Sequence, residues 1–251
     1  MENRRNIILK PILGGALLGA FLLAVMPVFA YEQNNTHPAL TANIVDFYNL
    51  SLSGRELTYQ EKRWLIQGSI NEDNGVRMLY HFYDPVHDRG LAMVAGASSK
   101  NWGLAINFQA NVLGRQYAGF SSVFSDGSKA DYSYQRALDD YAKGDRERAF
   151  VAFGHILHLL EDAGVPDHTR DDPHPPILDL GSPYEHEMAK WNPDNFQIAR
   201  ALFLRREKPV FLNSMEGYLN RVAKYSNNNF FSKDTIFVDR YNNPTVDLWN
   251  Y

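Results

Sequence analysis

Residues 145–166 constrain the fold of this chain most strongly. Their apolar side chains recur at helical spacing and form a broad face, made up of Ala149, Phe150, Phe153, Ile156, Leu157 and Leu160. A face this wide needs burial on several sides, so we expect the segment to be the central helix of an all-α bundle. Asp145 is a suitable N-cap, and Pro166 ends the helix.

Helical spacing of apolar residues predicts further helices on both sides of this segment. The expected ranges are 36–50 with Thr36 as N-cap, 57–70, an Ala- and Gly-rich stretch at 91–120, 132–141, 184–206 with a break at Asn192 and Pro193, and 209–225. Residues 227–251 are rich in asparagine and contain short runs of β-type residues, such as 235–238. We therefore expect one helical domain at 31–226, followed by a short irregular tail.

The N-terminus has the pattern of a secretory signal peptide. Basic residues at positions 4, 5 and 10 precede an apolar stretch at 12–29, and Val28 and Ala30 are the small residues that signal peptidase requires. We expect cleavage after Ala30 and a secreted or periplasmic protein; an uncleaved membrane anchor is the alternative.

Composition excludes several classes of function. The chain has no cysteine, which rules out a disulfide scaffold, a Cys-ligated zinc site and a thiol nucleophile. The formal charge is −4, and removal of residues 1–30 takes away three basic side chains and one acidic one, which leaves −6. An acidic chain lacks the basic field of an extended nucleic-acid surface. A phosphate-binding Gly-rich loop and a Gly-x-Ser-x-Gly motif are also absent from the sequence.

Histidines are concentrated around the central helix. Five of the eight histidines fall within thirty-two residues, at positions 155, 158, 168, 174 and 186. His158 and Asp162 are four residues apart, so on a helix their side chains lie on one face and can reach the same ion. Because Pro166 ends the helix, His168 approaches from the loop beyond it. Imidazole and carboxylate groups are suitable zinc ligands, although a single pair at this spacing is more often a surface hydrogen bond.

Other candidate ligands occur in a specific order along the chain. His37 and Asp73 are followed by the string His-Phe-Tyr-Asp-Pro at 81–85, by His158-Leu-Leu-Glu-Asp-Ala-Gly-Val-Pro-Asp-His168, and by Glu185. Over residues 31–190 this order resembles the zinc-dependent phospholipase C and P1/S1 nuclease superfamily, and is closer to the phospholipase C branch. The resemblance implies a helical domain that holds up to three zinc ions and hydrolyses phosphodiesters.

The resemblance also implies which residues bind each ion. Asp73, His81, His158 and Asp162 would bind the first zinc. Asp162 would bridge to a second zinc, held by His37 and by the backbone amine and carbonyl of Tyr31 as the mature N-terminal residue, where the family usually has Trp. A third zinc would be bound by His168 together with a histidine and an acidic residue further along the chain.

The third set departs from the family pattern. The family places the last histidine four residues before the acidic residue, but position 181, four before Glu185, is Gly. We prefer His174 with Glu185 for this set, and keep His186 and Glu187 as alternatives. Glu72 is likewise an alternative to Asp73.

By this resemblance we expect an exported zinc-dependent phospholipase C that cleaves phosphatidylcholine-like lipids, with Asp73 as the catalytic carboxylate that helps deprotonate water. Its partner would be a phospholipid or another phosphodiester. We also expect that it can contact a membrane surface transiently and that it forms no stable complex with nucleic acid. A single-strand nuclease or 3'-nucleotidase on the same metal core is one alternative. A secreted binding protein whose metal ions only stabilise the fold is another.

Overall fold

The computed structural model describes residues 35–92, 97–117, 130–174, 181–195, 197–236, 238–242 and 244. The expected signal peptide, its cleavage site and Tyr31 lie outside these residues. Regular structure in the described part is helical, and its β-type pairing is confined to a bridge between Asp84 and Arg89, so the all-α prediction is confirmed. No helix in these ranges has the length and apolar character needed to cross a membrane.

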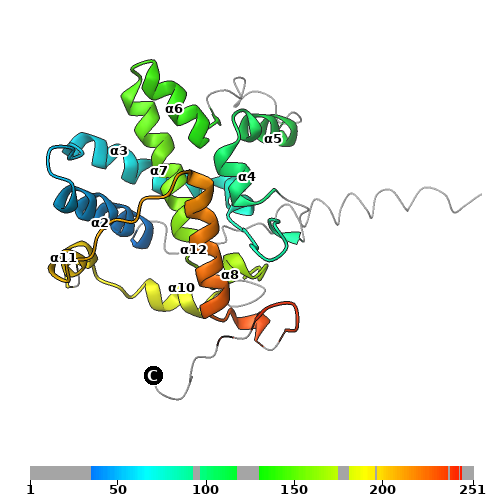
Figure 1. Cartoon of the computed structure of the whole chain (residues 1–251). Coiled ribbons are helices and arrows are strands. Elements are labelled where there is room, and N and C mark those ends of the chain that lie inside the picture. The colour runs from blue at the N-terminus through cyan, green and yellow to red at the C-terminus, as the bar shows by residue number, and fades with distance from the viewer. Residues whose placement is uncertain are drawn as a thin grey trace, which may run out of the picture.

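Figure 1 shows how the helices are arranged. Their bounds are α2 Thr36–Ser51, α3 Tyr59–Glu72, the 3-10 turn η1 Gly75–Tyr80, α4 Ser99–Leu104, α5 Phe108–Tyr117, α6 Tyr134–Ala142, α7 Arg146–Asp162, α8 Pro166–Thr169, α10 Pro183–Met188, α11 Ile198–Leu204, α12 Met215–Asn229 and the 3-10 turn η4 Lys233–Thr235.

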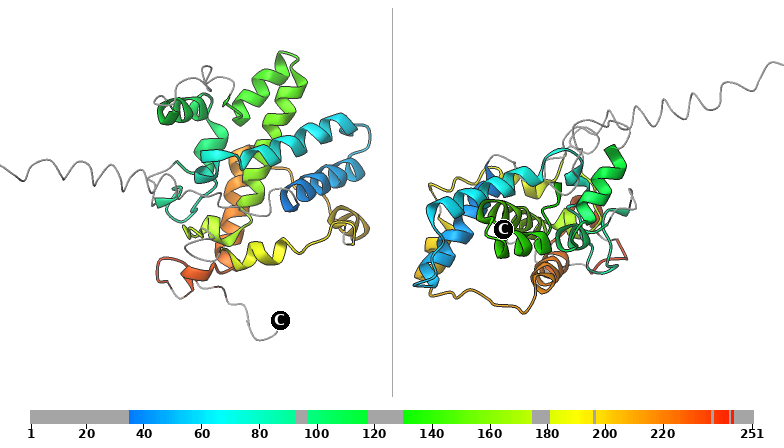
Figure 2. Two further views of the ribbon diagram at one scale, coloured as in Figure 1. Left: turned by 180° about the vertical axis from the view of Figure 1, so that it is seen from behind. Right: turned by 90° about the horizontal axis from the view of Figure 1, so that it is seen from above.

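Helix α7 is the central helix, as its broad apolar face predicted. The side chain of Asp145 accepts a hydrogen bond from the backbone N–H of Arg148, which confirms the predicted N-cap. Figures 1 and 2 show α7 between α2 and α3 on one side and α4 and α12 on the other. Each of the three buried apolar clusters includes a residue of α7 or the residue after it: Ile156 and Leu159 with Trp102, Phe150 with Val45 and Leu65, and Ala163 with Leu219 and Ala223.

Two glycines allow α3 and α7 to pack closely. A Cβ atom on Gly154 would lie 2.1 Å from the carbonyl oxygen of Leu65, and one on Gly68 would lie 1.9 Å from that of Val151. Neither position can carry a larger side chain without moving a backbone. Because Asp73 directly follows α3 and Asp162 ends α7, this contact helps to set the spacing between the two carboxylates.

The helix predicted at 91–120 is two helices, α4 and α5. The chain turns between them at Asn107, which has a left-handed backbone conformation with φ 61°. The N–H of Asn107 donates to Asp131 Oδ2 over 2.7 Å, so a residue distant in sequence stabilises the turn. The end of the predicted range, 118–120, lies outside the described residues.

Other predicted boundaries were wrong because caps lie elsewhere. Thr36 is the first residue of α2 and not its N-cap. Helix α6 starts at Tyr134 because Ser133 accepts a hydrogen bond from the N–H of Arg136. Ser214 caps α12 in the same way, so this helix starts at Met215 and not at position 209. The predicted break at 192–193 is longer, since α10 ends at Met188 and α11 begins at Ile198.

The C-terminal residues pack onto the loop that follows α8. Helix α12 continues past the expected boundary to Asn229, and a 3-10 turn at residues 233–235 overlaps the start of the β-type run 235–238. Buried Arg170 donates to the carbonyl oxygens of Asn227 and Asn242 and to Thr235 Oγ1. Its guanidinium also lies 5.2 Å from the Tyr241 ring centre. The tail therefore supports the loop after α8, which carries His174.

Candidate metal centre

Eight of the nine expected ligands lie in the described part of the chain, and the fold brings them together. His37 lies in the first turn of α2, and Asp73 and His81 directly follow α3 and η1. His158 and Asp162 lie in the last turns of α7. His168 lies in α8, His174 in the loop after it and Glu185 in α10. All eight are buried: His37, Asp73, His81, His158, Asp162, His168, His174 and Glu185. Tyr31 lies outside the described residues.

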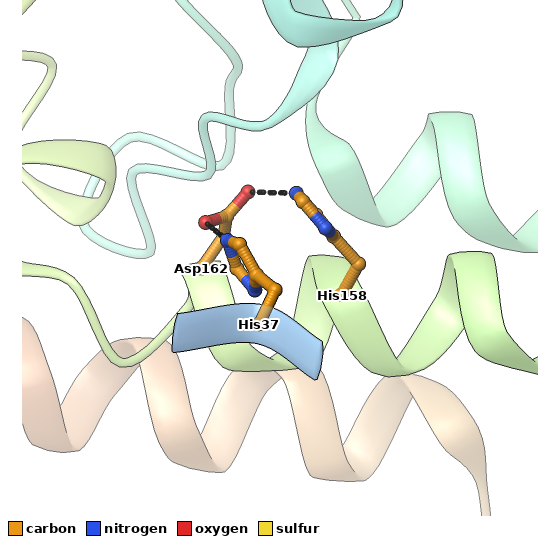
Figure 3. Close-up of side chains that lie close together, drawn as sticks. All are labelled: His37, His158 and Asp162. Atoms are coloured by element: carbon orange, nitrogen blue, oxygen red, sulfur yellow. Dashed lines mark ion pairs between the residues drawn. The ribbon is translucent and has the colours of Figure 1, made fainter. Parts of the chain in front are cut away.

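Asp162 lies at the centre of this group, and Figure 3 shows its carboxylate with the ion pairs that it makes with His37 and His158. Its Oδ1 is 3.5 Å from His37 Nε2 and 3.5 Å from His168 Nδ1. Its Oδ2 is 2.8 Å from His81 Nδ1 and 3.3 Å from His158 Nε2. The two oxygens of one carboxylate therefore face two different pairs of histidines. His158 and Asp162 share a face of α7, as their spacing predicted.

Two further sets of side chains adjoin Asp162. Asp73 Oδ1 lies 3.4 Å from His158 Nε2 and 3.7 Å from His81 Nδ1. Glu185 Oε1 lies 3.1 Å from His174 Nε2 and 3.5 Å from His168 Nε2. Their ligand atoms cluster in three groups within reach of a metal ion: His37, His158 and Asp162; Asp73, His81 and His158; and His168, His174 and Glu185.

A hydrogen bond joins two of the segments that carry these residues. The backbone N–H of Tyr83 donates to the carbonyl oxygen of His168 over 2.9 Å. This bond holds the string 81–85 against α8, and so brings His81 and His168 to opposite sides of the Asp162 carboxylate. A backbone hydrogen bond thus joins the two most specific sequence motifs, residues 81–85 and 158–168.

The polar atoms of this cluster fit metal ions better than they fit one another. Both oxygens of Asp73, Oδ1 of Asp162, Nε2 of His81, Nε2 of His158 and Nδ1 of His168 are buried and form no hydrogen bond of standard geometry among the described residues. Buried polar atoms are rarely left in this state, because each one costs the free energy of its lost hydration. Imidazole and carboxylate donors around one point match the ligand preference of zinc. The protein thus contains buried groups that could hold metal ions.

Protein groups fix the orientation of three of the imidazoles. His158 Nδ1 donates to the carbonyl oxygen of Ser69 over 2.7 Å, and His174 Nδ1 to that of Asp172 over 2.9 Å. His37 Nδ1 lies 2.6 Å from Glu161 Oε2. When a metal ion is bound, such bonds keep the ring proton on Nδ1 and leave the other ring nitrogen to bind the ion. Sequence reasoning missed Glu161, although it lies within the most specific motif, next to Asp162.

Glu72 does not replace Asp73 in the cluster. It accepts hydrogen bonds from Arg77 Nε over 2.8 Å and from Trp102 Nε1 over 2.6 Å, and His155 Nδ1 also contacts it. His155 is thus hydrogen-bonded to Glu72, whose Oε1 lies 3.8 Å from His81 Nε2 in the cluster. The positive charge of Arg77 lowers the pKa of Glu72, although burial alone would raise it, so this carboxylate is ionised.

The alternatives for the third set lie outside the cluster. His186 is exposed, and Glu187 is 72% exposed and pairs with Lys190. Gly181 adopts φ 76°, and a Cβ atom there would lie 3.1 Å from His186 Nε2. The backbone therefore disfavours a histidine at position 181, and the imidazole beside Glu185 is that of His174.

Carboxylates dominate the charge of the cluster in the absence of metal. Burial by itself lowers the pKa of a histidine, but facing Asp73 and Asp162 raise the pKa of His158 well above its ordinary value of 6.5. Against the same burial, Asp162 and Glu185 raise the pKa of His168 to about 10. Burial would raise the pKa of Asp162, yet His168, His158 and His81 lower it well below its ordinary value.

Metal binding should therefore release protons. At pH 7, metal-free His158 and His168 carry protons, and only a neutral imidazole can bind a metal. The pKa values of His37 and His174 are raised as well, so we expect about two to four protons to leave per chain on zinc binding at neutral pH. The apparent affinity should rise as pH increases from 6 to 8, because fewer protons remain to be displaced. Isothermal titration calorimetry in buffers of different ionisation enthalpy measures this number.

A His186→Ala variant is the matched control, because its imidazole is exposed outside the cluster. It should release as many protons as the wild type. A heat of binding that is independent of the buffer would contradict the assignment of protonated, ion-facing histidines.

No protein-family model, curated protein or solved structure matches the chain.

Proposed function

We propose that the protein is an exported, zinc-dependent phosphodiesterase of the phospholipase C type, which hydrolyses phosphatidylcholine-like lipids. The observation that carries the proposal is the Asp162 carboxylate, whose two oxygens face separate histidine pairs in a buried site. A purely structural zinc site usually has four ligands around a single ion. A carboxylate shared between ligand sets is typical of centres that act on phosphodiesters.

Each residue of the cluster would have a separate role in the reaction. Bound zinc would supply Lewis acidity, which acidifies water and polarises a phosphoryl oxygen. Asp162 would hold two ions at a fixed separation. Asp73 would bind through Oδ1, which faces His81 and His158, and would accept a proton through Oδ2 as water attacks phosphorus. His168, His174 and Glu185 would hold the remaining ion for the non-bridging oxygen.

The substrate class follows from the motif order and from charge. The string 81–85 is the part of the sequence that most resembles the phospholipase C branch, and its His81 lies against Asp162. The chain has no basic excess with which to bind an extended polynucleotide. Both points favour a lipid phosphodiester over single-stranded nucleic acid.

The test is a pair of hydrolysis assays on the same preparation. Phosphatidylcholine vesicles should yield phosphocholine, a chelator should abolish the reaction, and added zinc should restore it. Single-stranded DNA should remain intact under the same conditions. Cleavage of DNA without cleavage of lipid would support the nuclease alternative and contradict the proposal, and absence of both activities in a zinc-loaded, folded protein would also contradict it.

A further inference from the structure

The last turn of α11 and its connection to α12 expose several large apolar side chains. Phe203 is 47% exposed, Leu204 70%, Val210 54% and Phe211 69%. Single exposed apolar residues are common on protein surfaces, but four within nine positions are a feature of binding surfaces. Figures 1 and 2 show this connection running along the outside of the bundle.

Basic side chains accompany these apolar residues. Arg200, Arg205, Arg206 and Lys208 are all exposed, and Glu207 is the only acidic residue in the segment 200–211. The segment therefore carries a charge of +3 in a chain whose formal charge is −4. Positive charge beside exposed aromatic and aliphatic groups is complementary to an anionic lipid surface, which offers phosphates above a hydrocarbon interior.

The backbone holds this segment in a defined shape. Helix α11 ends with Arg206 in a left-handed conformation, φ 61°. The N–H of Arg206 donates to the carbonyl oxygen of Phe203 over 2.9 Å and that of Glu207 to Leu202 over 3.0 Å, which is the hydrogen-bond pattern of a Schellman turn. These bonds fix the direction in which the chain leaves Phe203 and Leu204.

The second half of the segment is fixed by α12. The hydroxyl of Tyr218 donates to the carbonyl oxygen of Val210 and accepts from the N–H of Leu212, over 3.2 and 2.9 Å. Val210 and Phe211 are thus exposed on a tethered backbone. A surface that is already ordered loses less conformational entropy when it binds.

We propose that residues 200–211 form a membrane-binding surface that docks on bilayers containing anionic phospholipids. Its apolar side chains would enter the boundary between head groups and acyl chains, and its basic side chains would pair with lipid phosphates. The inference rests on the proposed function in one respect, because it names the way in which the enzyme would reach its lipid substrate. The binding itself follows from the surface.

The experiment measures co-sedimentation of the protein with sucrose-loaded vesicles on ice. The vesicles contain phosphatidylcholine alone, or phosphatidylcholine and phosphatidylglycerol at about three to one. All proteins are expressed as the full chain and checked by N-terminal sequencing to have the same N-terminus. Wild type should bind the anionic vesicles more tightly than the neutral ones, and raised salt should reduce the difference.

Two variants test the two components of the surface. Leu204→Ser/Phe211→Ser should weaken binding to both vesicle types by at least about tenfold. Arg205→Glu/Lys208→Glu should weaken binding to the anionic vesicles by about thirtyfold or more and leave binding to neutral vesicles nearly unchanged. Tyr59→Ser/Arg63→Glu on α3 is the matched control, since it also removes an exposed aromatic ring and reverses an exposed basic charge. It should bind as the wild type does.

Hydrolysis of a soluble short-chain phosphatidylcholine separates this proposal from the proposed function. Loss of vesicle binding with unchanged hydrolysis of the soluble lipid supports both. Vesicle binding by a wild type that hydrolyses no lipid supports the surface and contradicts the phospholipase. Equal vesicle binding by wild type and both variants overturns the membrane-binding surface. So does a wild type that forms a dimer through this segment and does not bind vesicles.

Discussion

Asp162→Asn is expected to abolish phosphodiesterase activity and leave the helical bundle folded. Asparagine has the same size, but it cannot present two anionic oxygens to the two histidine pairs around it. We expect kcat/KM to fall by about a thousandfold or more. Without the shared carboxylate, the two zinc ions would no longer be held together and could not stabilise the transition state. Phosphocholine release and circular dichroism measure the two effects.

The number of zinc ions that the variant retains makes this prediction specific. The set His168, His174 and Glu185 has its own carboxylate, so the variant should keep one ion and lose the others. Asp194→Asn, which changes an exposed aspartate, is the control and should retain both metal and activity. Activity close to that of the wild type would contradict a bridging role for Asp162. An unfolded variant would instead favour ions that only stabilise the fold.

Glu72→Gln is expected to give the largest loss of stability. The side chains of Glu72 and Arg77 are both buried, so the change leaves a guanidinium without its carboxylate in a site that excludes water. Breaking such a pair from one side costs about 3 kcal/mol or more in the free energy of unfolding. Urea denaturation of the metal-free protein measures the loss. Glu187→Gln, in an exposed pair with Lys190, should unfold at the wild-type urea concentration.

A double variant distinguishes the lost pair from general damage to the core. Arg77→Met alone should also destabilise the protein, because it leaves the Glu72 charge buried. Glu72→Gln/Arg77→Met removes both charges, so its loss should be smaller than the sum of the two single losses. Strictly additive losses would show that the two side chains do not act as a pair.

The interiors of the helices and the N-cap of α7 at Asp145 could be predicted from local patterns, whereas several other helix ends could not. The wide apolar face at 149–160 was sufficient to place α7 at the centre, because burial on several sides is a property of the segment itself. The turn at Asn107 depends on a hydrogen bond from its N–H to the Asp131 carboxylate, and the position of the tail depends on Arg170. Contacts of this kind join residues far apart in sequence, so no local pattern reveals them.

The same distinction applies to the candidate site. The spacing of His158 and Asp162 predicted that these two side chains share a helix face, and motif order predicted the other ligands. The prediction that His168 lies in a loop was wrong, because Pro166 starts the short helix α8, which contains His168. The structure groups all the described members, His174 and Glu185 among them. The residues that hold them in place, Glu161 and the carbonyl group of Ser69, could not be inferred, because their role is set by how α2, α3 and α7 pack.

Metal analysis of the purified protein tests the central claim most directly. Inductively coupled plasma mass spectrometry on the protein after gel filtration should find about three zinc ions per chain, removable by a chelator and restored by added zinc. A folded protein that contains no divalent cation, and takes none up when zinc is supplied, would contradict the account.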